Sequence, residues 1–395
     1  MKLEDAVAVA LKENPELKGK RAAISIAEGR LRQAGAWPNP VLEISAEDVP
    51  ARSADISRGK RVIEMEQAVS LGGKVGWRKR AALLQLSLAE AEYQAAVREV
   101  SFHVQDRFVQ VLAAQERKTL AEVEAALARE IATLAEALVQ AGAVSPVELT
   151  KAEVEAAKSQ GELEETEVHF QSVEAGLRKE MGAPALQVAR YDGELADEII
   201  WPDQEDLPGL FSAHPAMLAK SLKKEAAQAQ AGLARAEAWP DVSLKAGAGR
   251  ADGDRASIVQ GMIAFPLPLF NRNQGSVQEA KAAIRLAEAE QESLYQQLRQ
   301  EWEEATNRVG QAMKQVKRYR RDILPRAEKV LSAVQEGYRE GKFRYIEVLE
   351  AQRSLAGARR VVLESVSTVN RGRWQIILLM GDTGVTVPPA TLPKD

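Results

Sequence analysis

The stretch Val41-Leu-Glu-Ile-Ser-Ala-Glu-Asp48 alternates between apolar and polar side chains. In an extended chain, Leu42, Ile44 and Ala46 would lie on one side and the polar groups on the other. Three further stretches alternate in the same way, at residues 62–69, 242–248 and 257–265. This pattern is typical of a transmembrane β-strand with its apolar side toward lipid, and equally of a hairpin in a water-soluble protein. On the alternation alone, both interpretations stay open.

Aromatic residues beside these stretches favour a membrane. Trp37 and Trp239 precede the first stretch of each pair, and Trp77 and Phe270 follow the second. Aromatic side chains concentrate at the two surfaces of a bilayer. The connecting segments, 50–60 and 250–256, are polar, as expected for solvent-side loops. The sequence therefore predicts two transmembrane hairpins, with these four aromatic residues at the membrane interface.

The chain carries one series of motifs twice. Five pairs recur in the same order at a spacing of about 200 residues: Asn14-Pro15 with His214-Pro215, Ala36-Trp-Pro38 with Ala238-Trp-Pro240, Leu88-Ala-Glu-Ala-Glu92 with the same pentapeptide at Leu286 to Glu290, Gly142 to Leu149 with Gly341 to Val348, and Met181-Gly182 with Met380-Gly381. Such recurrence predicts internal duplication. We expect a first repeat at 1–182, a linker at 183–209 and a second repeat at 210–395.

Each repeat has the same predicted elements. The expected order is a helix, two strands, a very long helix and a returning helix, at 15–36, 41–69, 74–140 and 146–181, and again at 215–238, 242–265, 274–340 and 343–380. A helix of 65 residues is roughly 100 Å long. Its thin, Ala-rich apolar stripe suits coiled-coil packing. The same stripe is typical of a soluble coiled-coil scaffold or adaptor protein, which is the alternative interpretation of the whole chain.

Composition excludes several functions. The 395 residues have a net charge of −4 and no basic stripe, so we expect no nucleic-acid partner. There is no cysteine, and the three histidines are isolated, so we expect no metal site, no cofactor and no enzyme activity. The first residues, Met1 to Leu17, are acidic where a secretory signal is basic, so we expect that the signal peptide is absent from this sequence.

Four strands are too few to close a barrel by themselves. Open sheet edges in a membrane leave backbone groups without hydrogen-bond partners, at several kcal/mol per group. The smallest closed membrane barrels have about eight strands. If the strands lie in a membrane, several copies of the chain must share one barrel.

Three motifs, together with the duplicated arrangement, resemble those of the TolC-type outer-membrane factors of tripartite efflux pumps. They are Gln67-Ala-Val-Ser-Leu-Gly-Gly-Lys74, Phe265-Pro-Leu-Pro-Leu-Phe-Asn-Arg-Asn-Gln-Gly275 and Gly341-Lys-Phe-Arg-Tyr-Ile-Glu-Val-Leu-Glu-Ala-Gln352. Within that family the chain is most similar to the heavy-metal (CzcC-like) branch. The resemblance covers essentially the whole chain.

The resemblance implies a mainly α-helical fold with a small membrane β-barrel. Three chains would form an α-helical barrel, and their strands would share one 12-stranded barrel. The homotrimer would sit in outer-membrane lipid and extend into the periplasm. It would bind a periplasmic adaptor (membrane fusion) protein and, through it, an inner-membrane pump of the RND type. It would be a passive conduit for heavy-metal cations or small toxic compounds.

The resemblance also implies the functional residues. The acidic constriction of the family corresponds to Glu347 and Glu350, one helical turn apart. A ring of such carboxylates would attract cations at the narrow end of a channel. The tips where adaptor hairpins dock correspond to residues at the two helix turns, namely Gly142, Val144, Val147, Glu148, Gly341, Phe343, Tyr345 and Ile346.

Overall fold

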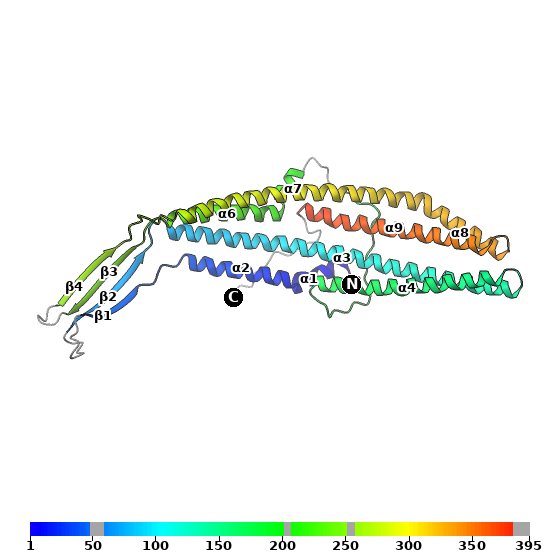
Figure 1. Cartoon of the computed structure of the whole chain (residues 1–395), viewed down its shortest axis with the longest axis horizontal. Coiled ribbons are helices and arrows are strands. Elements are labelled where there is room, and N and C mark those ends of the chain that lie inside the picture. The colour runs from blue at the N-terminus through cyan, green and yellow to red at the C-terminus, as the bar shows by residue number, and fades with distance from the viewer. Residues whose placement is uncertain (48–58, 201–206, 251–256, 382–395) are drawn as a thin grey trace. The chain divides into compact units, whose positions relative to one another are not determined.

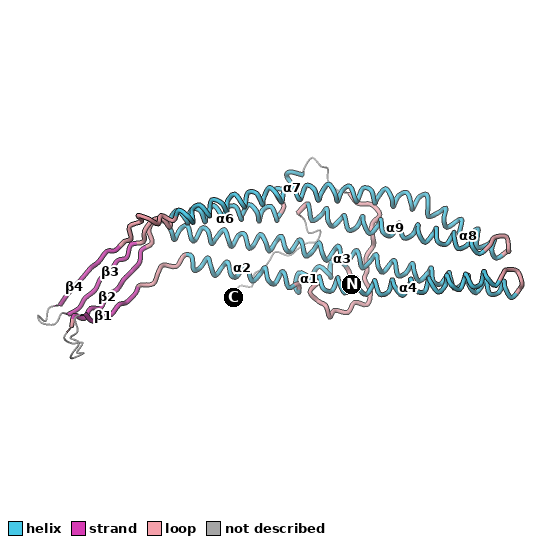
Figure 2. The backbone as a smooth tube through the Cα atoms, viewed as in Figure 1, coloured by secondary structure: helices cyan, strands magenta, loops and turns pink. Residues whose placement is uncertain are grey.

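A computed structural model describes residues 1–47, 59–200, 207–250 and 257–381. The chain is mainly helical with four strands, as expected (Figures 1 and 2). The connecting segments expected at 50–60 and 250–256 fall almost entirely outside the described residues, as does the end of the second repeat. No helix among the described residues is long and apolar enough to cross a bilayer.

The two halves of the chain contain similar elements in the same order. The first half consists of α1 (Leu3–Glu13), α2 (Pro15–Ala34), β1 (Val41–Glu47), β2 (Lys60–Val69), α3 (Lys74–Gln140) and α4 (Pro146–Glu180). The second consists of α5 (Leu207–Ala213), α6 (Pro215–Ala236), β3 (Val242–Arg250), β4 (Ser257–Ala264), α7 (Gln274–Arg318), the π-helical turn η3 (Tyr319–Ile323), α8 (Leu324–Arg339) and α9 (Tyr345–Leu379).

Two short helices, α1 and α5, were not expected from the sequence. Each ends immediately before an X-Pro pair, Asn14-Pro15 or His214-Pro215, because proline disfavours helical geometry in the residue that precedes it. The Asn14 side chain then caps the next helix by accepting a hydrogen bond from Glu16 N at 2.8 Å. The prolines therefore mark a junction between two helices, and not only the start of one helix as predicted.

The second long helix is not the single α-helix predicted for 274–340. It is interrupted by η3, directly before Pro325 near the start of α8. Proline lacks an N–H group, and its ring collides with the carbonyl four residues earlier, so a wider π turn relieves the clash. The first half has no proline at this point, and α3 runs unbroken for 67 residues.

The four strands form one antiparallel sheet in the order β1-β2-β3-β4. Directly paired residues lie on the same face of a sheet. Leu42 pairs with Met65 and Ile44 with Ile63, and the apolar row continues through β3 and β4. The alternation read from the sequence thus places all four apolar rows on one face.

The described residues form two compact units. One lies within 1–19, 94–214 and 295–395, and the other comprises 20–93 and 215–294. Each unit takes segments from both halves, so the compact units and the predicted repeats divide the chain differently. The repeat boundaries stay a prediction.

Each unit has its own buried core, built from small residues in one and including large aromatic residues in the other. In the strand-bearing unit, Ala231, Ala234 and Ala280 form a cluster between α6 and α7, and Glu290 contacts Lys220 and Lys223 at 2.7–2.9 Å. In the other unit, Phe211 lies edge-on to Trp302, whose side chain is fully buried.

Candidate gate, hairpin tips and membrane sheet

Both helical hairpins turn at a glycine with left-handed backbone. Gly142, between α3 and α4, and Gly341, between α8 and α9, each have a φ of +73°. The following amides complete the turn: Ala143 N donates to Leu138 O at 2.8 Å, and Lys342 N donates to Gly337 O at 2.7 Å. Because side chains disfavour this backbone geometry, glycine fixes both turns.

The returning helix α9 begins with a cap made by a predicted gate residue. Arg344 N donates to Glu347 Oε2 at 2.8 Å, which satisfies an otherwise unpaired amide. Glu347 is half-buried, whereas Glu350 is exposed one turn later. Neither carboxylate forms an ion pair with a described residue. In α4 the cap is Ser145, whose hydroxyl accepts from Val147 N at 3.3 Å.

Two tyrosines join the hairpins behind the tips. The rings of Tyr338 and Tyr345 lie 6.3 Å apart, and both residues are buried with Ile131, Ala135 and Ala152. Burial, then the nearby Glu155, raises the pKa of Tyr345 to about 12. Tyr345 was predicted at the docking surface. The structure places it in the core instead, because its ring fills the space between the hairpins and is only 2% exposed.

The other predicted tip residues stay at the surface or are half-buried. Val147, Phe343 and Ile346 are exposed apolar side chains, and Gly142 and Gly341 are exposed at the turns. Val144 and Glu148 are half-buried. Phe343 packs on Gly337: a Cβ built on this glycine would lie 2.2 Å from the ring. The turn of the second hairpin therefore depends on a glycine in α8 that the sequence analysis did not single out.

Ion pairs between α4 and α9 were also missed. Arg353 contacts Glu155 through two hydrogen bonds of 3.3 and 2.8 Å, and Arg360 contacts Glu162 at 2.5 Å. Both pairs join residues 198 positions apart. The spacing of an arginine and a glutamate at about the repeat length is the signal that could have found them.

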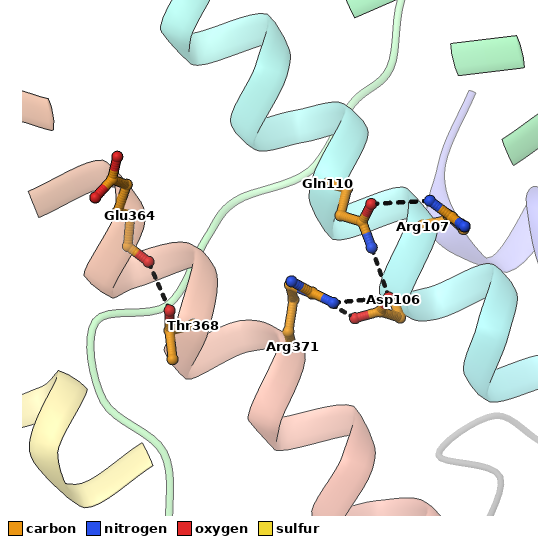
Figure 3. Close-up of polar contacts among 6 residues, drawn as sticks. All are labelled: Asp106, Arg107, Gln110, Glu364, Thr368 and Arg371. Carbon is orange, nitrogen blue, oxygen red and sulfur yellow. Dashed lines mark hydrogen bonds and ion pairs between the residues drawn. The ribbon is translucent and has the colours of Figure 1, made fainter. Parts of the chain in front are cut away.

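A third arginine of α9 reaches α3. Figure 3 shows Arg371 pointing at Asp106, with Nε 2.6 Å from Oδ1 and Nη2 3.3 Å from Oδ2. Gln110 donates to Asp106 Oδ2 at 2.6 Å and accepts from Arg107 at 3.1 Å. Asp106 is thus held by Arg371 of α9 and Gln110 of α3 through charge-assisted hydrogen bonds. The Thr368 hydroxyl in the same view bonds only its own helix, at Glu364 O.

The sheet has one apolar and one polar face. Its apolar face is open to the surroundings, with Leu42 62%, Ile44 74% and Val259 84% exposed. On the other face, Lys245 forms ion pairs with Glu43 and Glu66, each at 3.1 Å, and Gln260 bonds Glu64. Strands β1 and β4 each have an edge with no partner strand among the described residues.

Three of the four predicted interface aromatics are exposed. Trp37, Trp239 and Phe270 have exposed fractions of 62%, 63% and 91%. Trp77 differs, because its ring lies on Gly232 of α6, where an added Cβ would come within 2.4 Å of Cζ3. Trp77 therefore packs two helices together in its unit, and α6 needs a glycine at this contact.

Among the residues that the structure describes, no group of three or more histidine, aspartate or glutamate side chains could hold a metal ion. The arrangement is instead that of paired long hairpins and an amphipathic sheet. The chain belongs to the outer membrane efflux protein family, whose family model matches residues 6–183 and 210–381.

Several named proteins are similar to this chain. The cobalt-zinc-cadmium resistance protein CzcC of Cupriavidus metallidurans is 32% identical over 90% of this chain and 84% of its own length. The nickel and cobalt resistance protein CnrC of the same species is 26% identical over 71% and 66%. The solved structure of CusC matches with a TM-score of 0.83 and 17% identity, covering 96% of this chain and 92% of CusC. The outer membrane protein VceC of Vibrio cholerae gives 0.77 and 21%, over 96% of each chain. The chain therefore has the fold of outer-membrane efflux channels.

Proposed function

We propose that three copies of this chain form a passive outer-membrane conduit that extends into the periplasm and serves a tripartite efflux pump. The observation that carries this proposal is the four-stranded sheet, which has an exposed apolar face and two open edges. In hydrocarbon, the unpaired groups of β1 and β4 would cost several kcal/mol each. Pairing β4 of one copy with β1 of the next removes both open edges.

The number of copies comes from the family. Two copies would already supply eight strands, which is enough to close a small barrel. The family resemblance favours three copies and a 12-stranded barrel. Trp37, Trp239 and Phe270 would then lie at the membrane surfaces, while the polar face with Lys245 would line the lumen. A soluble coiled-coil scaffold, the alternative, gives no reason for such an exposed apolar sheet.

The gate is proposed at Glu347 and Glu350. Neither carboxylate is neutralised by a residue that the structure describes, so three copies would place six negative charges around the axis. Such rings favour cations and disfavour anions. The cap made by Glu347 orients its carboxylate at the first turn of α9. In the first hairpin the equivalent positions are Glu148 and Lys151, so that hairpin would not add a second acidic ring.

The hairpin tips are proposed to bind the periplasmic adaptor protein, which connects the conduit to an inner-membrane pump of the RND type. Val147, Phe343 and Ile346 offer exposed apolar contacts for a partner helix. Tyr345 would support this surface from inside. The chain itself would do no chemistry, because the pump supplies the energy.

The proposed cargo is heavy-metal cations, with small toxic compounds as the second class. The names of the relatives CzcC and CnrC support metal cations. The duplicated organisation proposed at 1–182, 183–209 and 210–395 is supported by the two matched segments, which leave a gap at 184–209.

Reconstitution of the purified protein into planar bilayers tests the conduit. We expect stepwise conductance increments with cation preference at neutral pH. Membrane insertion without any conductance, or fractionation of the protein as a water-soluble monomer, would contradict the proposal.

A further inference from the structure

In the two helical hairpins, α4 and α8 each contact both α3 and α9. Helix α4 contacts α9 through Glu162 and Arg360, and it contacts α3 through Glu167 and Lys118 at 3.0 Å. Helix α8 contacts α9 through Glu328 and Arg359 at 3.3 Å. It contacts α3 through Arg339 and Glu130 at 3.1 Å. The four helices are thus ordered α3, α4, α9, α8 around their common core.

The outer face of α4 is exposed and carries acidic groups. Opposite the buried Thr166, the helix exposes Gly161, Glu164, Glu165 and Val168. Val168 is 66% exposed, and Glu165 forms no ion pair with any described residue. Gly161 has nothing near its missing Cβ, so a second helix could approach closely at this point.

The outer face of α7, η3 and α8 carries the opposite charge. Six cationic residues within 16 positions are exposed there and pair with no acidic residue in the described part of the chain: Lys314, Lys317, Arg318, Arg321, Arg326 and Lys329. Arg318 and Lys314 lie opposite the buried Val316 of the same helix, so they point away from the core. Arg320 in this stretch does have a described acidic partner, Asp197 at 2.8 Å.

The two faces lie at the same height along the hairpins. Glu162 of α4 contacts Arg360 of α9, which is 198 positions later in the chain. By the same offset, Glu165 of α4 lies at the height of Leu363 of α9. Arg359 of α9 contacts Glu328 of α8. Because these two helices of one hairpin run in opposite directions, Leu363 lies at the height of Leu324. Arg321 is three residues from Leu324, which is roughly one helical turn.

We propose that these faces form a heterologous seam between copies, in which Arg318 and Arg321 of one chain bind Glu164 and Glu165 of the next. This inference rests on the proposed ring of three chains. In a cyclic assembly, the two faces that meet must lie at the same height. If the face of α9 with Glu350 lines the lumen, then α4 and α8 are the lateral helices that meet neighbours. A second copy fits both the sign of the charges and their height along the hairpins.

Cysteine cross-linking tests the seam, and the chain suits it because it contains no cysteine of its own. Glu165→Cys and Arg321→Cys are placed on separate, differently tagged full-length chains, which are co-expressed and treated in detergent with a short bismaleimide. We expect a covalent dimer containing both tags. The control pairs Arg321→Cys with Val154→Cys, which lies on the same face of α4 but about 16 Å away along the axis. It should give no dimer.

Native mass spectrometry of the same samples separates the outcomes. Trimers that cross-link at 165 but not at 154 support the seam. Trimers that cross-link at neither position, or equally at both, overturn the seam and leave the proposed conduit intact. An absence of trimers overturns both proposals.

Charge exchange is the second readout. The R318E/R321E variant and the E164R/E165R variant should each raise the trimer dissociation constant by about tenfold or more. Their combination should restore it, because the opposite charges then meet again. The seam is contradicted if the trimer of the combined variant dissociates as readily as the two separate effects together predict. It is also contradicted if a separate acidic protein binds the basic face of intact trimers.

Discussion

Arg371 of α9 and Asp106 of α3 are joined by two hydrogen bonds of 2.6 and 3.3 Å, in which the guanidinium spans both carboxylate oxygens (Figure 3). Asp106 has only 17% of its side chain exposed, and Gln110 also bonds it. Together with Arg353 and Arg360, Arg371 gives α9 three ion pairs to the first hairpin, and Arg339 of α8 adds a contact to Glu130 of α3. All four arginines contact acidic residues of the first hairpin.

Arg371→Met should lower the free energy of unfolding by about 1–2 kcal/mol, because charge-assisted hydrogen bonds are stronger than neutral ones but half of Arg371 faces solvent. Asp106→Asn should have a similar effect. A double-mutant cycle followed by chemical denaturation in detergent measures the coupling. Strictly additive effects of the two changes would show that the contact contributes nothing.

Gly337→Ala should destabilise the second hairpin by about 1–3 kcal/mol, because its new methyl group overlaps the Phe343 ring. Shortening the ring in Gly337→Ala/Phe343→Leu should recover most of the loss. Gly357→Ala is the control, because nothing lies near that position, and alanine there should be neutral or slightly stabilising. Thermal melts of the three variants make the comparison. Equal melting temperatures for Gly337→Ala and Gly357→Ala would contradict the packing described here.

Glu347→Gln/Glu350→Gln should reduce cation selectivity and alter single-channel conductance in planar bilayers. Glutamine at 347 can still cap α9, so the fold is kept while the charge is removed. Glu336→Gln removes an exposed charge from the same hairpin and should leave the conductance unchanged. Selectivity that is the same in all three proteins would remove Glu347 and Glu350 from the constriction.

His214 should make the fold less stable in acid. Its Nε2 lies 3.1 Å from Leu378 O, and burial is the main cause that lowers its pKa. The unfolded chain therefore takes up the proton more readily than the folded chain. The stability due to His214 is fully present above the pKa of the unfolded chain, about 6.5, and is lost as the pH falls through the lower pKa of the folded chain.

Asn14, whose Nδ2 donates to Glu180 O at 2.9 Å in the first half, suggests the matched variant His214→Asn. Denaturation midpoints between pH 8 and pH 5 should fall more steeply for the wild-type chain than for this variant. Parallel pH profiles would exclude His214 as the cause.

The parts of the fold that depend on local patterns could be predicted from the sequence. The four strands follow from their alternation, and α3 begins and ends at the predicted residues, Lys74 and Gln140, because no breaker interrupts it. The turns at Gly142 and Gly341 follow from glycine alone. By contrast, η3 arises because the helix absorbs Pro325 instead of ending there, and local preference does not decide between these outcomes.

Features that depend on tertiary contacts were missed or misplaced. Tyr345 belongs to the tip motif, but its partner Tyr338 in the core is found only once α8 and α9 are paired. Trp77 stays a predicted interface aromatic, but the contact of its ring with Gly232 in another segment was not predicted. The contact of Arg371 with Asp106 joins residues 265 positions apart, and neither residue belongs to a local motif.

The mass of the intact particle in detergent tests the central claim most directly, since a four-stranded sheet with open edges requires other copies in a membrane. Native mass spectrometry of the purified chain should give a single species of three subunits, each of 43.1 kDa. A stable single subunit that remains folded in detergent, with no larger species at any protein concentration, would contradict the account.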